Sequence, residues 1–225
     1  MKSFVTGIVV VSTLLLAQSC SSPSISQNQS QAPSPTATSA SNKVEEHRGH
    51  GSSMNHNHAV NLGPADADYD LRFIDAMTPH HQGAVVMAKE ALAKSNRPEI
   101  KQLAENIIKA QNQEIEQMKQ WRKGWYPQSS DRAVAYDAQA GHTMAMSPEQ
   151  MQAMMMSQDL GAGDETFDRR FIDAMIPHHE GALTMAQDAL NKTKHPEIKK
   201  LAQDILTSQQ QEIDQMKQWR KDWYK

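Results

Sequence analysis

The sequence predicts an all-α protein, a four-helix bundle made of two duplicated antiparallel helical hairpins. The first observation is an internal repeat: residues 69–126 align without a gap with residues 167–224, and 37 of the 58 positions are identical. The second is that each copy carries two apolar stripes with helical spacing. The third is the short connection between the two stripes, which is typical of an antiparallel hairpin. Because one hairpin cannot cover its own apolar stripe, we expect the two to pack together.

The composition excludes two classes of protein. The chain has 14 methionines and 10 histidines but only one cysteine, so no internal disulfide can form. Its net charge is -3, and it therefore lacks the basic surface that a nucleic-acid-binding protein presents. We expect no nucleic-acid partner and no disulfide framework.

Residues 1–19 have the pattern of a secretory signal peptide. Lys2 precedes an apolar run, and small residues follow the run before Cys20. The run is too short to span a bilayer, which takes about 20 apolar residues. Cleavage after Ser19 predicts a periplasmic or secreted protein. A lipid anchor on Cys20 is an alternative that would tie the chain to a membrane, although Gln18 departs from the lipoprotein pattern.

Four segments follow the signal peptide. Residues 20–65 are rich in Ser, Gln, Pro, Asn and Ala, and their low content of large apolar residues predicts a disordered spacer. Residues 66–126 contain the first hairpin repeat, and residues 166–225 contain the second. Residues 127–165 form a methionine-rich linker between the repeats.

Prolines punctuate the predicted helices. Pro79 lies inside the first helix, where it removes one backbone hydrogen bond and crowds the carbonyl of Asp75. We expect either a kink or broken turn there, or a new helix segment that begins at Pro79 after a short leading one. The second helix of each repeat is expected to begin at Pro98 or Pro196, because proline is favoured at the first helical position.

Each repeat carries the same cassette of one methionine and two histidines. The cassettes consist of Met77, His80 and His81, and of Met175, His178 and His179. These side chains share the helix face on which leucine is usual. Imidazoles buried beside thioethers need a reason, and binding of a soft metal ion is the best one.

Helical geometry predicts which donors meet. Met77 and His81 are four residues apart on one face, and in an antiparallel hairpin Met77 lies within one helical turn of Met118. We therefore expect a cluster of these three side chains. The corresponding cluster in the second repeat is Met175, His179 and Met216.

A further methionine follows each cassette, Met87 in the first repeat and Met185 in the second. Met87 lies about 15 Å along the helix from Met77. It cannot share ligands with Met77, so it would make a second site with His80 or with a residue of the other hairpin.

Plain packing is the alternative for these residues. A methionine on an apolar helix face is usually part of the core. Gln111 and Glu114 can hydrogen-bond to the imidazoles, which avoids the cost of an unpaired buried polar group, about 1–3 kcal/mol. The combination of paired histidines, flanking methionines and Met/His-rich tracts in both linkers favours metal binding.

Ligand type selects the metal. Thioethers favour Cu(I) and are poor ligands for Mg, Ca or Zn, while imidazole suits copper as well. We predict Cu(I), with Ag(I) as its surrogate. The N-terminal tract from His47 to His58 can take Cu(II), and with low specificity Zn or Ni.

The linker adds a second group of soft donors. These are His142, Met144, Met146, Met151, Met154, Met155 and Met156. Two interpretations stay open: the linker collects additional soft ions, or it forms a short amphipathic helix that covers the bundle.

The cassette Phe-Ile-Asp-Ala-Met-x-Pro-His-His-x-Gly-Ala, at residues 73–84 and 171–182, resembles the bacterial domain-of-unknown-function 305 family, and in particular its CopM-type copper-binding proteins. The resemblance covers both repeats. It implies an exported, ferritin-like four-helix bundle that binds Cu(I) or Ag(I) through methionine and histidine and supports copper tolerance. By position it implies ligands at Met77, His80, His81, Met87 and Met118, and at Met175, His178, His179, Met185 and Met216.

The favoured function is therefore a non-enzymatic, exported copper-binding protein. It would sequester Cu(I) or hand it to a copper efflux or sensor component of the cell envelope. The alternative is a carboxylate-bridged di-metal redox enzyme in which Glu114 and Glu212 face the histidines. Neither repeat has the Glu-x-x-His motif of that class. A third hypothesis is an envelope scaffold whose methionines and histidines only pack.

Overall fold

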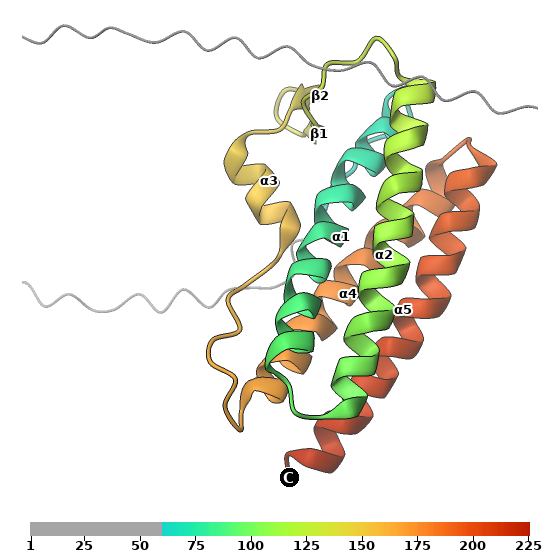
Figure 1. Cartoon of the computed structure of the whole chain (residues 1–225). Helices are drawn as coiled ribbons and strands as arrows, with labels where there is room; N and C mark the ends of the chain where they lie inside the picture. The colour runs from blue at the N-terminus through green and yellow to red at the C-terminus, as the bar shows by residue number, and fades with distance from the viewer. Residues whose placement is uncertain (1–59) are drawn as a thin grey trace, which may run out of the picture. The chain divides into compact units, whose positions relative to one another are not determined.

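The computed structural model describes residues 60–225, in which two helical hairpins pack into a four-helix bundle (Figure 1). The predicted signal peptide and most of the predicted spacer lie outside the described residues. The predicted all-α bundle of two duplicated hairpins is confirmed. In chain order the elements are α1 (Tyr69–Lys94), α2 (Pro98–Trp125), β1 (Val134–Asp137), β2 (His142–Ala145), α3 (Pro148–Met155), α4 (Phe167–Lys192) and α5 (Pro196–Trp223).

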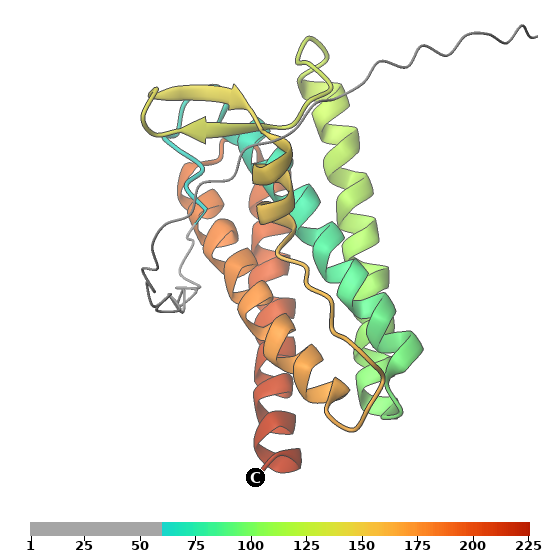
Figure 2. The ribbon, with the colours of Figure 1, turned by 90° about the vertical axis from the view of Figure 1, so that its left-hand side faces the viewer.

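The duplication is visible in the helices. α1 and α4 have 26 residues each, and α2 and α5 have 28 each. α1 packs along α2, α4 packs along α5, and the hairpins meet chiefly where α1 contacts α4 (Figures 1 and 2). None of the helices formed by residues 60–225 is both long and apolar enough to cross a membrane.

The prolines define the helix starts but do not interrupt the helices. α2 and α5 begin at Pro98 and Pro196, as predicted. Pro79 and Pro177 lie inside single continuous helices, so the predictions of a broken turn and of a separate segment at Pro79 were wrong, while the kink stays a prediction. A proline in a helix interior costs about 3 kcal/mol. α1 contacts α2, α4, α3 and β1, and this packing holds the helix together across Pro79.

The linker folds against α1. It contains two strands that the sequence analysis did not predict, β1 and β2, which pair antiparallel with Val134 opposite Ala145. Strands of four residues are too short to show a clear alternation of apolar and polar residues. The short helix α3 follows, and Ser147 and Gln150 cap its start reciprocally. Both β1 and α3 contact α1 (Figure 2).

An arginine near the start of α1 ties the linker and the preceding segment to the bundle. Arg72 is fully buried and donates to the carbonyl oxygens of Leu62 (2.7 Å) and Pro64 (2.8 Å) and to Thr143 Oγ1 on β2 (2.6 Å). Arg170, at the equivalent position of α4, donates in the same way to Leu160 and to Ala162.

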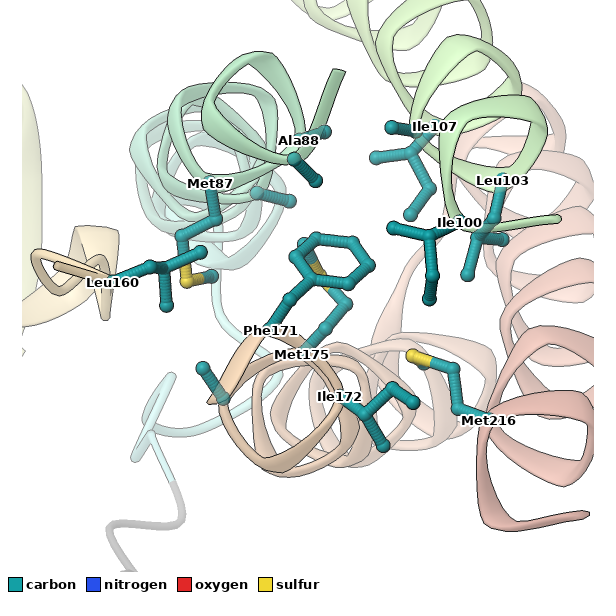
Figure 3. Packing of buried hydrophobic residues seen from close by; sticks show 14 of the residues in the cluster. Met87, Ala88, Ile100, Leu103, Ile107, Leu160, Phe171, Ile172, Met175 and Met216 are labelled. Atoms are coloured by element: carbon teal, nitrogen blue, oxygen red, sulfur yellow. The ribbon is translucent and has the colours of Figure 1, made fainter. Parts of the chain in front are cut away.

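The core consists of two apolar clusters, each built from halves of both hairpins because α1 and α4 run in opposite directions. The Met87 cluster joins the C-terminal half of α1 to the N-terminal half of α4, and includes Met87, Met175 and Met216 (Figure 3). The Met77 cluster joins the opposite halves, and includes Met77, Met118 and Met185. The layer between the two clusters is polar.

We predict that Arg72→Met lowers the free energy of unfolding by about 3 kcal/mol, because it leaves buried acceptors unpaired. Arg170→Met is the matched control: the side chain of Arg170 is 35% exposed, so water can replace its bonds. Its loss should cost about 1 kcal/mol. Urea denaturation followed by circular dichroism measures both, and equal costs for the two variants would contradict this account.

Candidate metal centre

The polar layer between the clusters is formed by four histidines and two glutamines. We call it the histidine layer; its members are His80, His81, His178, His179, Gln111 and Gln209. Each of them is at most 3% exposed. Neighbouring residues on a helix point about 100° apart, so one imidazole of each pair faces the other hairpin while the next one faces the second helix of its own hairpin.

The two imidazoles that face the other hairpin meet at the centre of the bundle. The ring centroids of His80 and His178 are 3.9 Å apart and their planes are inclined by 34°. None of the four nitrogens in these two rings makes a hydrogen bond. The α1–α4 contact therefore brings two unpaired imidazoles from separate repeats to one point.

The other two imidazoles bind carboxylates of their own hairpins. His81 Nε2 lies 2.7 Å from Glu114 Oε2, and His179 Nε2 lies 2.6 Å from Glu212 Oε2. Glu114 thus satisfies one nitrogen of His81, as the packing alternative expects, but Gln111 Oε1 has no partner. The remaining Nδ1 atoms of both histidines are also unpaired.

Unpaired polar atoms concentrate in this layer. Among the described residues, twelve buried side-chain nitrogen and oxygen atoms lack a hydrogen bond, and eight of them belong to the histidine layer. Each such atom costs about 1–3 kcal/mol. A cation that accepts the free lone pairs of the imidazoles would recover part of this cost.

Burial keeps the central pair uncharged. It holds the pKa of His80 well below the usual histidine value, and charges on His178, His81 and His179 add to the effect. Burial likewise lowers the pKa of His178 to about 3, with smaller contributions from His179 and His81. Both rings are therefore neutral at physiological pH, which is the form that binds metal ions.

The predicted thioether donors lie in the apolar clusters on either side of the layer. Met77 and Met118 share one cluster, and Met118 Sδ lies 4.0 Å from Thr78 Oγ1. Met175 and Met216 share the other. Each further methionine packs with the cassette methionine of the other repeat. Met87 packs in the cluster of Met175 and Met216, while Met185 packs in the cluster of Met77 and Met118.

Figure 3 shows how side chains of the Met87 cluster pack. The ring of Phe171 lies between Met87 and Met216, beside Met175. Within residues 60–225, no three His, Cys, Asp or Glu side chains converge closely enough to hold a metal ion.

The linker donors do not gather in one place. His142 and Met144 are exposed on β2, whereas Met146 is buried in the Met77 cluster. Met151 and Met154, on α3, are partly buried against the same cluster. Met155 and Met156 are half-buried at the end of α3. The linker thus contains a short helix that covers the bundle, as one of the two interpretations expected.

Sequence reasoning missed two glycines that bring this helix close to the histidines. A Cβ atom at Gly83 would lie 1.7 Å from the carbonyl oxygen of Met155. A Cβ atom at Gly181 would lie 3.2 Å from His80 Nε2 and 3.5 Å from Met156 Sδ. The signal was present in the repeated His-His-x-Gly pattern. Only the path of the linker shows that the absence of a side chain at these glycines lets Met155 and Met156 come close.

The metal-free protein should lose stability as the pH falls from about 6.5 towards about 3. The folded-state pKa of His178 is about 3 against 6.5 for a free histidine, so the unfolded chain binds more protons in this interval. His80→Leu combined with His178→Leu should flatten this dependence and leave the protein at least as stable at neutral pH, since it removes unpaired buried groups. Urea denaturation with a chelator present measures this, with the exposed His142→Gln as control. An unchanged pH dependence in the double variant would contradict the account.

Comparisons with known proteins show which solved structures share this fold. CopM in a silver-bound form (by soaking) is 41% identical, with a TM-score of 0.55 over 69% of this chain and 98% of that one. CopM in a Cu(II)-bound form is 44% identical over 69% and 97%, also with a TM-score of 0.55. A DUF305 fragment from Deinococcus radiodurans is 29% identical, with a TM-score of 0.52 over 68% and 95%.

A shorter match links the chain to an uncharacterized protein of Acanthamoeba polyphaga mimivirus, 51% identical over 49 residues. It spans 22% of this chain and only 32% of that relative. The sequence pattern of the domain of unknown function DUF305 matches residues 23–122 and 70–220. This chain therefore belongs to the DUF305 family, as its repeated cassette indicates.

Proposed function

We propose that this chain is an exported copper-binding protein that takes up Cu(I), and Ag(I) in its place, through histidine and methionine. The observation that carries the proposal is the buried pair of His80 and His178, whose ring nitrogens lack partners. Similarity to CopM, a protein solved in silver-, Cu(I)- and Cu(II)-bound forms, supports the choice of metal.

The donor chemistry supports a soft monovalent ion. The described residues offer neutral imidazoles and thioethers next to one another and contain no cysteine. Thioethers select Cu(I) over Mg, Ca and Zn, and a chain without thiolates at its sites is less exposed to oxidation outside the cytoplasm. The methionines and histidines of the two cassettes thus favour Cu(I) and Ag(I).

The biological role proposed is copper tolerance. Residues 1–19 would direct the chain out of the cytoplasm, with Cys20 as an optional lipid attachment point. Outside, the protein would lower the concentration of free Cu(I), or pass the ion to an efflux or sensor component of the envelope. Buried sites suit storage and transfer better than catalysis, because a substrate cannot reach the ion.

The di-metal enzyme is a weaker alternative. Glu114 and Glu212 do face His81 and His179, as that hypothesis requires. Each carboxylate, however, is engaged by the histidine of its own hairpin. A carboxylate-bridged site needs several carboxylates around two ions, and among residues 60–225 no such group of ligands converges.

Anaerobic titration of the full chain with Cu(I) against a colorimetric Cu(I) chelator tests the proposal. We expect uptake of at least one ion, and a large loss of uptake when His80, His81, His178 and His179 are all changed to leucine. Leucine keeps the layer apolar and filled, and circular dichroism checks the fold. No uptake by the unchanged chain would exclude copper binding, and undiminished uptake by the variant would place the ions in the linker or the N-terminal tract.

A growth experiment tests the cellular role. In a copper-sensitive bacterium, expression of the full chain should raise the copper concentration that stops growth. A chain without residues 1–19 should not, because it stays in the cytoplasm. The four-histidine variant serves as the binding-deficient control. Equal protection by all three chains would contradict a role that needs both export and the bundle site.

A further inference from the structure

We propose that His80, His178 and Met156 form a single Cu(I) site that both hairpins and the linker share, and that the end of α3 closes it. This inference rests on the proposed function and adds to it the identity of the ligands and the way the ion enters and leaves. It also means that the two repeats do not bind the central ion separately.

The first observation is the position of the imidazoles. His80 comes from α1 and His178 from α4, and the two rings face each other across the hairpin interface. They are 0% and 1% exposed, and no hydrogen bond of normal geometry engages their nitrogens, although the backbones of Met156 and His80 lie near the His178 ring. Because no hydrogen bond fixes either ring, both can turn a nitrogen towards an ion at the interface.

The second observation is the placement of Met156. Its sulfur and the Nε2 atom of His80 both border the small space above Gly181, where a Cβ atom would touch them. Met156 has a φ of 46°, and among the described residues it is the one non-glycine residue in the left-handed region. This conformation costs about 1 kcal/mol or more for a residue with a side chain. It ends α3 and holds the thioether against the histidine layer.

The third observation is the asymmetry of the covering segment. Gly83 and Gly181 occupy the same position in the two cassettes, yet they meet different parts of the linker. Gly83 admits the backbone of Met155, and Gly181 admits the side chain of Met156. The chain has one linker but two equivalent cassettes. The Met156 thioether therefore lies at one place between them, beside Gly181.

Two imidazoles and one thioether form a three-donor set that suits Cu(I) or Ag(I). The histidines are enclosed, so an ion reaches them only when a covering segment moves. α3 has eight residues, none of them fully buried, whereas α1 and α4 bury long stripes. Displacing the end of α3 therefore costs less free energy than displacing α1 or α4. When the end of α3 returns, the Met156 thioether would bind the ion.

Two variants of the full chain test the ligand. Met156→Leu removes the sulfur at similar volume, and Gln152→Leu is the control from the same helix, where the exposed side chain carries no metal donor. We expect Met156→Leu to weaken the tightest Cu(I) site at least about tenfold in chelator competition. X-ray absorption at the copper edge should show loss of a sulfur neighbour. Gln152→Leu should match the unchanged chain in both measurements.

A third variant tests closure without changing any donor. Gly83→Ala should push Met155 and Met156 away from the layer, weaken the same site and speed release of the ion to the chelator. Gly124→Ala is its control, because a Cβ atom there meets nothing within 4 Å. Circular dichroism verifies that both variants are folded.

The outcomes separate this inference from the proposed function. If the unchanged chain binds Cu(I) but Met156→Leu binds it equally well with the same sulfur signal, the shared site is wrong while copper binding stands. If Gly83→Ala and Gly124→Ala release the ion at the same rate, closure by α3 is wrong. If the unchanged chain binds no Cu(I), the proposed function itself fails, and this inference fails with it.

Discussion

The burial of four imidazoles in the middle of a helical bundle is the constraint on which the rest of this structure depends. Apolar side chains there would stabilise the fold more, since eight polar atoms of the layer lack partners. The apolar clusters on both sides of the layer offset this cost. Each cluster contains one half of every long helix of the bundle. The bundle can thus hold a reactive layer that a single hairpin could not enclose. Pro79 and Pro177, continuous in their helices, lie beside the same layer and are held by the same packing.

The repeat and the linker have different parts in this arrangement. Duplication supplies two equal cassettes and, through the opposed directions of α1 and α4, sets His80 against His178. It also supplies equal outer pairs, His81 with Glu114 and His179 with Glu212, which anchor the layer at its edges. The linker breaks the symmetry, because α3 lies against α1 and only Met156, the residue that follows it, reaches the second cassette. His80 and His178 form a symmetric pair of ligands, and Met156 of the linker would complete the site from one side. This arrangement favours one ion at the centre rather than one in each repeat.

Much of the fold could be predicted from the sequence, because its signals are local. The helical spacing and the prolines at residues 98 and 196 depend only on neighbouring residues. The repeat is a direct match between two stretches of the sequence, and the family follows from the cassette. The pairing of His80 with His178 could not be predicted, since it depends on how α1 crosses α4. The approach of Met156 depends on the path of a linker whose strands are too short to show a pattern. The glycine of the His-His-x-Gly pattern was visible, but its role lies in contacts with the linker, which the pattern itself does not show.

The most direct test of the central claim is a crystal structure of the full chain loaded anaerobically with Cu(I), with copper located by anomalous scattering. The account predicts a strong copper peak inside the bundle between His80 and His178, within bonding distance of both rings. A chain that carries copper only on β2 or at other exposed methionines, with the central imidazoles still unpaired, would contradict it. In that case the histidine layer would be a feature of packing and the metal chemistry would belong to the linker.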